Sequence, residues 1–295
     1  MPRHLAVAAR LFAMFAACHL SCVHAADAPV APPLRDLQQI DWTLHLPQQE
    51  VVEFHGVVDS NAGGASGTMM YPAPSMIGFL AAIATHVAIG AATRDHAETV
   101  RLEAADKVLL PYRDILKAYS YKDLMHQALD WTTAGRARQL VGGADQTSAG
   151  WIVDSAPTFA LTQDQSALVL ENTVLIHLAG GASYQNTVRV VSHPQSQPDL
   201  TAYWSAAEGK QLKEQSARLL ALSLDIAWKQ AASLAADTAA FKTVRYQQGR
   251  ADMVERAQLL DEACGRSLIK NLRGQLMSVP MRAGAVDDAQ RCDRI

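Results

Sequence analysis

The chain has 295 residues, of which 49% are apolar and 19% are charged, and its formal net charge is −3 at pH 7. This apolar content is enough to build a buried core and excludes a disordered chain. The sequence contains no basic run and no basic stripe interleaved with aromatic residues, so nucleic acid is not expected as a partner.

Residues 1–25 have the three parts of a bacterial-type secretory signal: a basic start with two arginines, an apolar stretch over residues 11–18 and a small-residue end at Ala25. The apolar stretch is too short for a membrane span, which needs about 20 residues. We therefore expect cleavage after Ala25 and a periplasmic or otherwise exported protein. Residues 26–36 are rich in Pro and Ala and are expected to form a tether ahead of the folded domain.

Lipidation at Cys18 is the alternative use of the same segment. The four residues that end at Cys18 resemble a lipobox, although Phe15 stands where Leu is usual, and a Pro/Ala tether often follows a lipid anchor. Cysteine parity favours simple cleavage, because cleavage after Ala25 leaves an even pair of cysteines, whereas lipidation leaves Cys22 unpaired. The alternative localisation is therefore a protein anchored by lipid to a membrane that faces the periplasm.

The two cysteines that remain after cleavage are Cys264 and Cys292. In an oxidising compartment such a pair is typically joined, and a disulfide that closes a loop of about 28 residues stabilises a protein by about 3 kcal/mol. The sequence therefore predicts a Cys264–Cys292 disulfide, with two free thiols as the alternative.

Residues 50–59 alternate between apolar and polar side chains, with Val52, Phe54 and Val58 on one face. This period of two predicts a half-buried strand. The glycine-rich residues 61–67 are typical of a turn after such a strand.

Residues 76–92 are the most apolar segment after the signal, and Ser75 is placed to cap a helix there. A segment of this length that includes His86 is short for a membrane span, so a buried helix is favoured and a membrane segment is the alternative. A buried imidazole needs a hydrogen-bond partner, which makes His86 a weak polar-site candidate. A satisfied core histidine is the simpler interpretation.

Three further helices are expected. Residues 95–98 resemble a capping box, and Pro111 is expected to kink the helix that follows. The apolar stripe of that helix comprises Val100, Ala104, Val108 and Tyr112. Ser120 begins the next helix, and a long helix covers residues 199–236, with Gly209 as its point of interruption. The apolar sides of these two helices comprise Leu124, Met125, Ala128 and Leu129, and Leu212, Leu219, Leu220, Ile226 and Ala227.

Elsewhere the hydrophobic period changes from that of a helix to that of a strand. Strands are predicted over residues 151–154, 159–161, 168–176 and 184–192, at a spacing that favours an antiparallel meander, and a hairpin is predicted over residues 241–247 and 253–260. This order favours an α+β fold in which the antiparallel β-meander packs against several α-helices. We expect a single domain over residues 37–295, behind the N-terminal signal segment.

The sequence contains none of the local motifs that mark common catalytic or metal sites. The histidines lack a zinc-binding spacing, and neither a nucleophile elbow nor a phosphate-binding loop is present, so we expect no metal and no cofactor. Ser267 and Lys270 have the SxxK spacing of serine acyl-enzymes, but the companion motifs of that class are missing. Chance explains this match.

Three further residues are weak polar-site candidates. Asp154 and Ser155 place a carboxylate and a hydroxyl side by side at the end of a predicted strand, and His177 lies on the same strand face as Glu171 and Thr173. The favoured function is a non-catalytic binding or accessory protein of the bacterial cell envelope, whose partner is an unknown protein or small-molecule ligand. The alternative is a periplasmic hydrolase or transferase with a site assembled from distant residues such as these three.

Overall fold

The computed structural model describes residues 40–58, 96–142, 150–178, 183–233 and 239–281. The described elements in chain order are β1 (Asp41–His45), β2 (Phe54–Gly56), α2 (His96–Ala105), the 3-10 helix η3 (Asp106–Tyr112), α3 (Arg113–Lys117), α4 (Tyr121–Trp131), β3 (Ala137–Val141), β4 (Trp151–Leu161), β5 (Leu168–Leu178), β6 (Ser183–Val191), α5 (Leu200–Ala232), β7 (Phe241–Gln248), β8 (Ala251–Ala263), β9 (Arg266–Asn271) and β10 (Leu276–Pro280).

The described strands form one ten-stranded sheet with the order β3-β1-β4-β5-β6-β10-β9-β8-β7, and β2 also pairs with β4. Most pairs are antiparallel, including the meander β4-β5-β6 that the sequence predicts. The parallel pairs are β1 with β3, β1 with β4, β2 with β4, and β10 with β6. The mixed α+β class is therefore confirmed, with a mostly antiparallel sheet.

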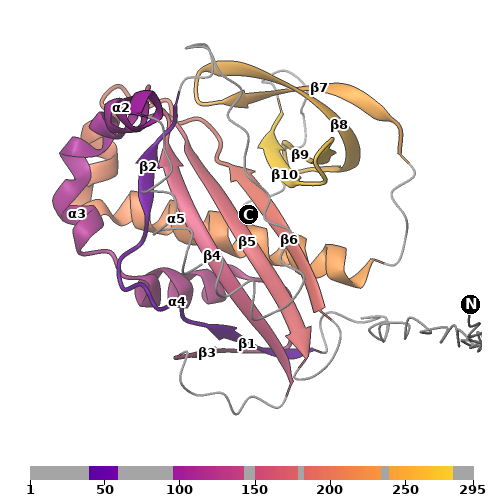
Figure 1. The fold of residues 1–295 in the computed structure, drawn as a ribbon. Helices are drawn as coiled ribbons and strands as arrows, with labels where there is room; N and C mark the ends of the chain where they lie inside the picture. Colours follow the sequence, from indigo (N-terminus) through magenta and orange to yellow (C-terminus); the bar gives the residue numbers. More distant parts are fainter. Residues whose placement is uncertain (1–39, 59–95, 143–149, 179–182, 234–238, 282–295) are drawn as a thin grey trace, which may run out of the picture.

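Helices cover one face of the central strands, and the C-terminal strands curl over the other face (Figure 1). The main core lies between the sheet and α3, α4 and α5, and it includes the fully buried Trp204 and Trp228. A smaller core lies on the opposite face, where Val191 of β6, Tyr246 of β7 and Val279 of β10 are clustered. Both faces of the central strands are therefore covered, each by a different part of the chain.

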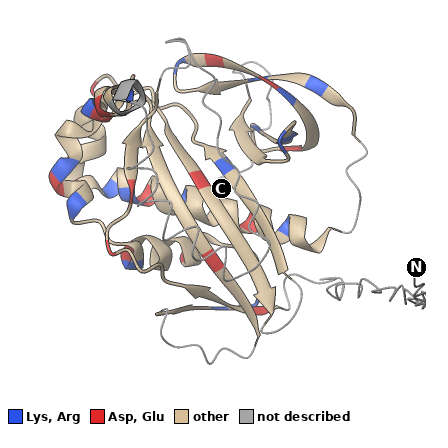
Figure 2. Ribbon diagram, viewed as in Figure 1, with Lys and Arg blue, Asp and Glu red and all other residues tan. Residues whose placement is uncertain are grey.

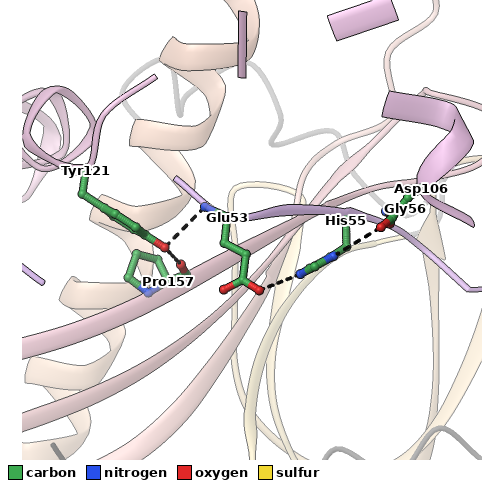
Figure 3. Close-up of polar contacts among 6 residues, drawn as sticks. All are labelled: Glu53, His55, Gly56, Asp106, Tyr121 and Pro157. Carbon is green, nitrogen blue, oxygen red and sulfur yellow. Dashed lines mark hydrogen bonds and ion pairs between the residues drawn. The ribbon is translucent and has the colours of Figure 1, made fainter. Parts of the chain in front are cut away.

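The middle of β4 contains Pro157. Strand β1 pairs with residues 151–154 and β2 with residues 159–161, so Pro157 falls in the gap between these two short strands. Proline has no N–H for a ladder hydrogen bond, and a gap in the pairing accommodates it. The hydroxyl of Tyr121 lies in this gap beside Glu53 and the carbonyl oxygen of Pro157 (Figure 3).

Two of the predicted helices are confirmed. The Ser120 hydroxyl caps α4 by accepting a hydrogen bond from the N–H of Asp123, and the predicted apolar side of α4 is buried except for a half-buried Leu129. Helix α5 buries all five predicted apolar residues, and its backbone leaves helical geometry at Ala206–Gly209. Gly209 has a φ of +78°, and a Cβ there would overlap the side chain of Ile115.

The predicted apolar stripe near Pro111 is wrong at its beginning. Val100 is 49% exposed and Ala104 is exposed, whereas Tyr112 is fully buried. The helix changes from α to 3-10 geometry at Asp106, and this 3-10 segment contains Pro111 and is followed by α3 at Arg113, so the predicted interruption at the proline is observed. Strand β2 docks at the same point. The N–H of Gly56 in β2 donates a 2.8 Å hydrogen bond to the Asp106 carboxylate.

Other predicted elements differ in extent. The strand over residues 50–59 is reduced to the three residues of β2 and an isolated bridge between Val51 and Ser120. The two predicted segments 151–154 and 159–161 are one strand, and β1, β3, β9 and β10 were not predicted. Residues 76–92, including His86, lie outside the described residues. Within the described part of the chain, no helix is long and apolar enough to cross a membrane.

Charged residues of both signs are interspersed over the helices and over β7 and β8 (Figure 2). Several form exposed or half-exposed ion pairs, such as Arg136 with Asp41 and Arg218 with Glu214. The mixed signs agree with the small net charge of the sequence.

Candidate functional site

A cavity of about 430 Å³ lies between the C-terminal half of α5 and strands β8, β9 and β10. Its wall comprises Thr133, Ala134, Leu222, Asp225, Ile226, Lys229, Asp261, Ala263, Cys264, Arg266, Leu268 and Ser278. The volume is within the range of small-molecule sites, and the combination of aliphatic side chains with a few polar groups is typical of them. This cavity is the candidate binding site.

Arg266, the first residue of β9, is the most buried charged group in the cavity wall. Its side chain crosses two neighbouring strands: Nε donates to the Ser278 hydroxyl at 2.9 Å, and Nη2 donates to the carbonyl oxygens of Val191 and Ser278 at 2.6 and 2.8 Å. All three acceptors are neutral. Burial lowers the pKa of Arg266 to about 10, so its guanidinium stays charged at neutral pH.

The other charged groups of the cavity wall have partners of their own. Lys229 and Asp261 form an ion pair of 2.7 Å. The carboxylate of Asp225 accepts hydrogen bonds from the backbone N–H groups of Thr133 and Ala134 and from the Thr133 hydroxyl. Burial raises the pKa of Asp225, and these hydrogen bonds oppose the rise. No carboxylate of the described chain pairs with Arg266.

A second polar cluster joins β1, β4 and β5 at Asp154. Its carboxylate lies 2.9 Å from Nδ1 of His45 and 3.0 Å from Nε2 of His177. Burial opposes ionisation of Asp154, but the hydrogen bonds from His177 and His45 outweigh it and lower the pKa of the carboxyl to about 2. An ionised carboxylate only accepts hydrogen bonds. The contacting nitrogen of each ring, Nδ1 of His45 and Nε2 of His177, must therefore carry a proton.

The structure thus brings together two of the four polar-site candidates, Asp154 and His177, and separates Ser155 from them, while His86 lies outside the described residues. Successive residues of a strand point to opposite faces, so Ser155 projects toward the helices. Its hydroxyl donates to the Asn172 side chain at 2.8 Å, and Asn172 in turn donates to Ser223 of α5. A serine nucleophile, histidine and aspartate are therefore not assembled from these three residues.

A third cluster of titratable groups surrounds His55 in β2 (Figure 3). Its Nε2 lies 2.8 Å from the Glu53 carboxylate, and its Nδ1 lies 3.8 Å from the Asp106 carboxylate. The hydrogen bond to Glu53 raises the pKa of His55 against the opposing effect of burial, and Asp106 adds to the rise. This cluster links β2 to η3.

The remaining sequence candidates have different outcomes. Cys264 takes part in a disulfide, but Cys18, Cys22 and Cys292 lie outside the described residues, so the predicted Cys264–Cys292 pairing stays a prediction. Ser267 and Lys270 lie in strand β9, where residues three apart point to opposite faces, so the helical SxxK geometry is not formed. Among the described residues, no group of three or more His, Cys, Asp or Glu side chains is arranged to hold a metal ion.

Sequence reasoning missed both His45 and Arg266. His45 lies 109 residues before Asp154, and β1 was not predicted, so nothing local connected the two. Arg266 carried a weak signal, since it shares a strand face with the apolar Leu268 and therefore points toward the interior. Comparison with known proteins adds no assignment: no protein-family model matches the chain, and no curated protein matches it either.

Proposed function

We propose that this chain is an exported, non-catalytic binding protein of the bacterial cell envelope that holds a small molecule in the cavity between α5 and β8–β10. The single observation that carries this proposal is the cavity itself, with its volume of about 430 Å³ and its mixed lining. Leu222, Ile226 and Leu268 supply apolar surface, whereas Arg266 and Ser278 supply hydrogen-bonding groups on one side.

Export is part of the proposal. We propose that residues 1–25 are a cleaved secretory signal, that residues 26–36 are a tether and that the domain begins near residue 37, with lipidation at Cys18 as the alternative. The disulfide at Cys264 supports an oxidising compartment. Cleavage after Ala25 would leave Cys292 as its only partner within the chain. Mass analysis of the exported protein, with and without reduction, distinguishes cleavage from lipidation and checks this pairing.

The binding function is tested by blocking the cavity. Octanoate, octanol and octylamine share one aliphatic body, and a binding protein of this kind should take at least one of them, as measured by calorimetry on the full chain. Leu222→Trp places a large ring in the cavity and should abolish that binding. Leu272→Trp is the control, because Leu272 is 66% exposed and does not line the cavity. Failure of all three probes to bind the unaltered chain would overturn the proposal.

A hydrolase or transferase is the second candidate, and the contact between His45 and Asp154 favours it. Asp154 fixes Nδ1 of His45, and no described residue hydrogen-bonds to Nε2, the nitrogen that would act as a general base. The His45 side chain is 20% exposed, so solvent reaches it. Hydrolysis of an activated ester such as p-nitrophenyl acetate tests this role: His45→Gln should reduce a genuine activity, and His126→Gln, on an exposed face of α4, should not.

A further inference from the structure

We infer that the ligand of this cavity is a monocarboxylate with an aliphatic body, and that its carboxylate binds Nη1 of Arg266. The inference rests on the proposed binding function and specifies its ligand class. The observation behind it is a buried cation that has no counter-ion within the described ranges: Arg266 is only 9% exposed, and its partners there are two carbonyl oxygens and one hydroxyl. No acceptor in the described part of the chain bonds to Nη1.

A buried charge without a counter-ion is unfavourable, because hydrogen bonds to neutral groups replace its hydration only in part. A bound anion would supply the missing charge and an acceptor for Nη1 together. Arginine is well suited to this role, since its other donors hold the guanidinium in place while one terminal nitrogen remains available. Here Ser278 and Val191 fix the orientation of Arg266 from β10 and β6.

The remaining charges of the cavity wall favour a single negative charge on the ligand. Lys229 is neutralised by Asp261, and the Asp225 carboxylate is held by Thr133 and Ala134. Among the described residues, Arg266 is therefore the one cation of the wall without a counter-ion. A doubly charged group such as a phosphate monoester would bring an excess negative charge into a cavity that already contains two carboxylates. A monocarboxylate balances Arg266 and adds no excess charge.

The rest of the ligand is expected to be aliphatic. Leu222 and Ile226 lie on neighbouring turns of α5, and Leu268 faces the cavity from β9, in phase with Arg266. These side chains offer dispersion contacts and no hydrogen-bonding groups. The polar end and the apolar surface together match a medium-chain carboxylate.

Calorimetry on the unaltered full chain separates this inference from the binding function. A charge-assisted hydrogen bond contributes about 1.5–3 kcal/mol, so octanoate should bind at least about tenfold more tightly than octanol, and octylamine should bind most weakly. Equal affinity for octanoate and octanol would overturn the ligand class and leave the cavity as a neutral binding site. If none of the three probes bound to the unaltered chain, the proposed binding function itself would be overturned. If octanoate binding persisted unchanged in Leu222→Trp, it would occur elsewhere and both proposals would fail.

A second readout, the pKa of His193, is measured on the unaltered chain. Burial and the nearby charge of Arg266 lower the pKa of His193 to about 4. A carboxylate bound to Arg266 would offset that charge, so saturation with octanoate should raise the His193 pKa in an NMR titration, whereas octanol should not. Arg266→Lys completes the test: it keeps the charge but loses the clamp on Val191 and Ser278, and it should weaken octanoate more than octanol. An unchanged His193 pKa under saturating octanoate would overturn the assignment to Arg266.

Discussion

The hydroxyl of Tyr121 donates a 2.9 Å hydrogen bond to the carbonyl oxygen of Pro157, between the end of β1 and the start of β2. Pro157 lacks an N–H, and its carbonyl has no partner strand on this edge of β4. A helix side chain therefore completes the hydrogen bonding of the sheet where the proline interrupts the pairing. Burial raises the pKa of Tyr121 to about 12, so its hydroxyl remains protonated and able to donate.

Tyr121→Phe removes this donor and leaves the buried carbonyl of Pro157 without a partner. We expect the free energy of unfolding to fall by about 1–3 kcal/mol, the usual effect of an unsatisfied buried group. Urea denaturation measures the change. Tyr203→Phe is the matched control, because the Tyr203 hydroxyl makes only a long contact of 3.5 Å with Gln211 and its loss should change stability far less. Equal effects of the two variants would contradict the role of Tyr121.

Gly56→Ala should destabilise the protein by about 3 kcal/mol, in the range of severe overpacking. A Cβ at this position would overlap the backbone carbonyl of Ala105, and the backbone there cannot rearrange without breaking the contact between β2 and Asp106. Gly142→Ala is the control, since a Cβ there meets no atom within 4 Å. Thermal unfolding compares the two, and a neutral Gly56→Ala would show that β2 is not seated tightly against η3.

The lowered pKa of Asp154 predicts that the free energy of unfolding decreases in acid. Its pKa is about 2 in the folded protein and 3.8 for the free group, so its contribution is complete above the higher value and is lost as the pH falls through the lower one. This difference of nearly two pKa units corresponds to between about 2 and about 3 kcal/mol of unfolding free energy. Asp154→Asn should remove this part of the decline in unfolding free energy between about pH 5 and pH 2. Asp130→Asn, at an exposed position, should leave the decline intact.

The raised pKa of His55 predicts a contribution to stability with the opposite pH dependence. Its folded-state pKa is raised, so its contribution is present below the unfolded value of 6.5 and is lost as the pH rises through the folded value. His55→Gln should therefore lower the free energy of unfolding more at about pH 5 than at about pH 9. The side chain is 39% exposed, and solvent screening limits the difference to about 1 kcal/mol or less. His126→Gln, measured in the same urea titrations, should show no such pH-dependent difference.

Local patterns predicted the elements whose signals lie close together in the chain. The cap at Ser120 and the apolar side of α4 follow from helical spacing alone. The β4-β5-β6 meander follows from period-two runs at hairpin spacing, and the interruption of α5 follows from Gly209. In each case the residues that determine the element are close together in the sequence, so a single sequence is sufficient to predict that element.

The features that the sequence did not predict depend on contacts between residues that are far apart in the chain. Strands β1 and β3 are short and pair in parallel with each other, which leaves no hairpin signal. Asp106, where the helix type changes, also accepts a hydrogen bond from the N–H of Gly56, 50 residues earlier, and no local pattern indicates this contact. The candidate cavity is the least predictable feature, because its wall combines α5, the segment after α4 and strands β8–β10, which are far apart in the sequence. Arg266 has no motif, and only its neutral partners distinguish it from other arginines.

The pairing of β1 with β4 also leads us to expect a particular order of folding. His45 and Asp154 are separated by 109 residues, and closing so long a loop costs chain entropy that hairpin pairing within β4-β5-β6 does not. We therefore expect the meander to become protected first and the N-terminal strand to dock last. Pulsed hydrogen exchange during refolding should show amides of β5 protected before those of β1. Because synthesis proceeds from the N-terminus, β1 is made long before its partner β4, and we expect the sheet to be completed only after most of the domain has emerged.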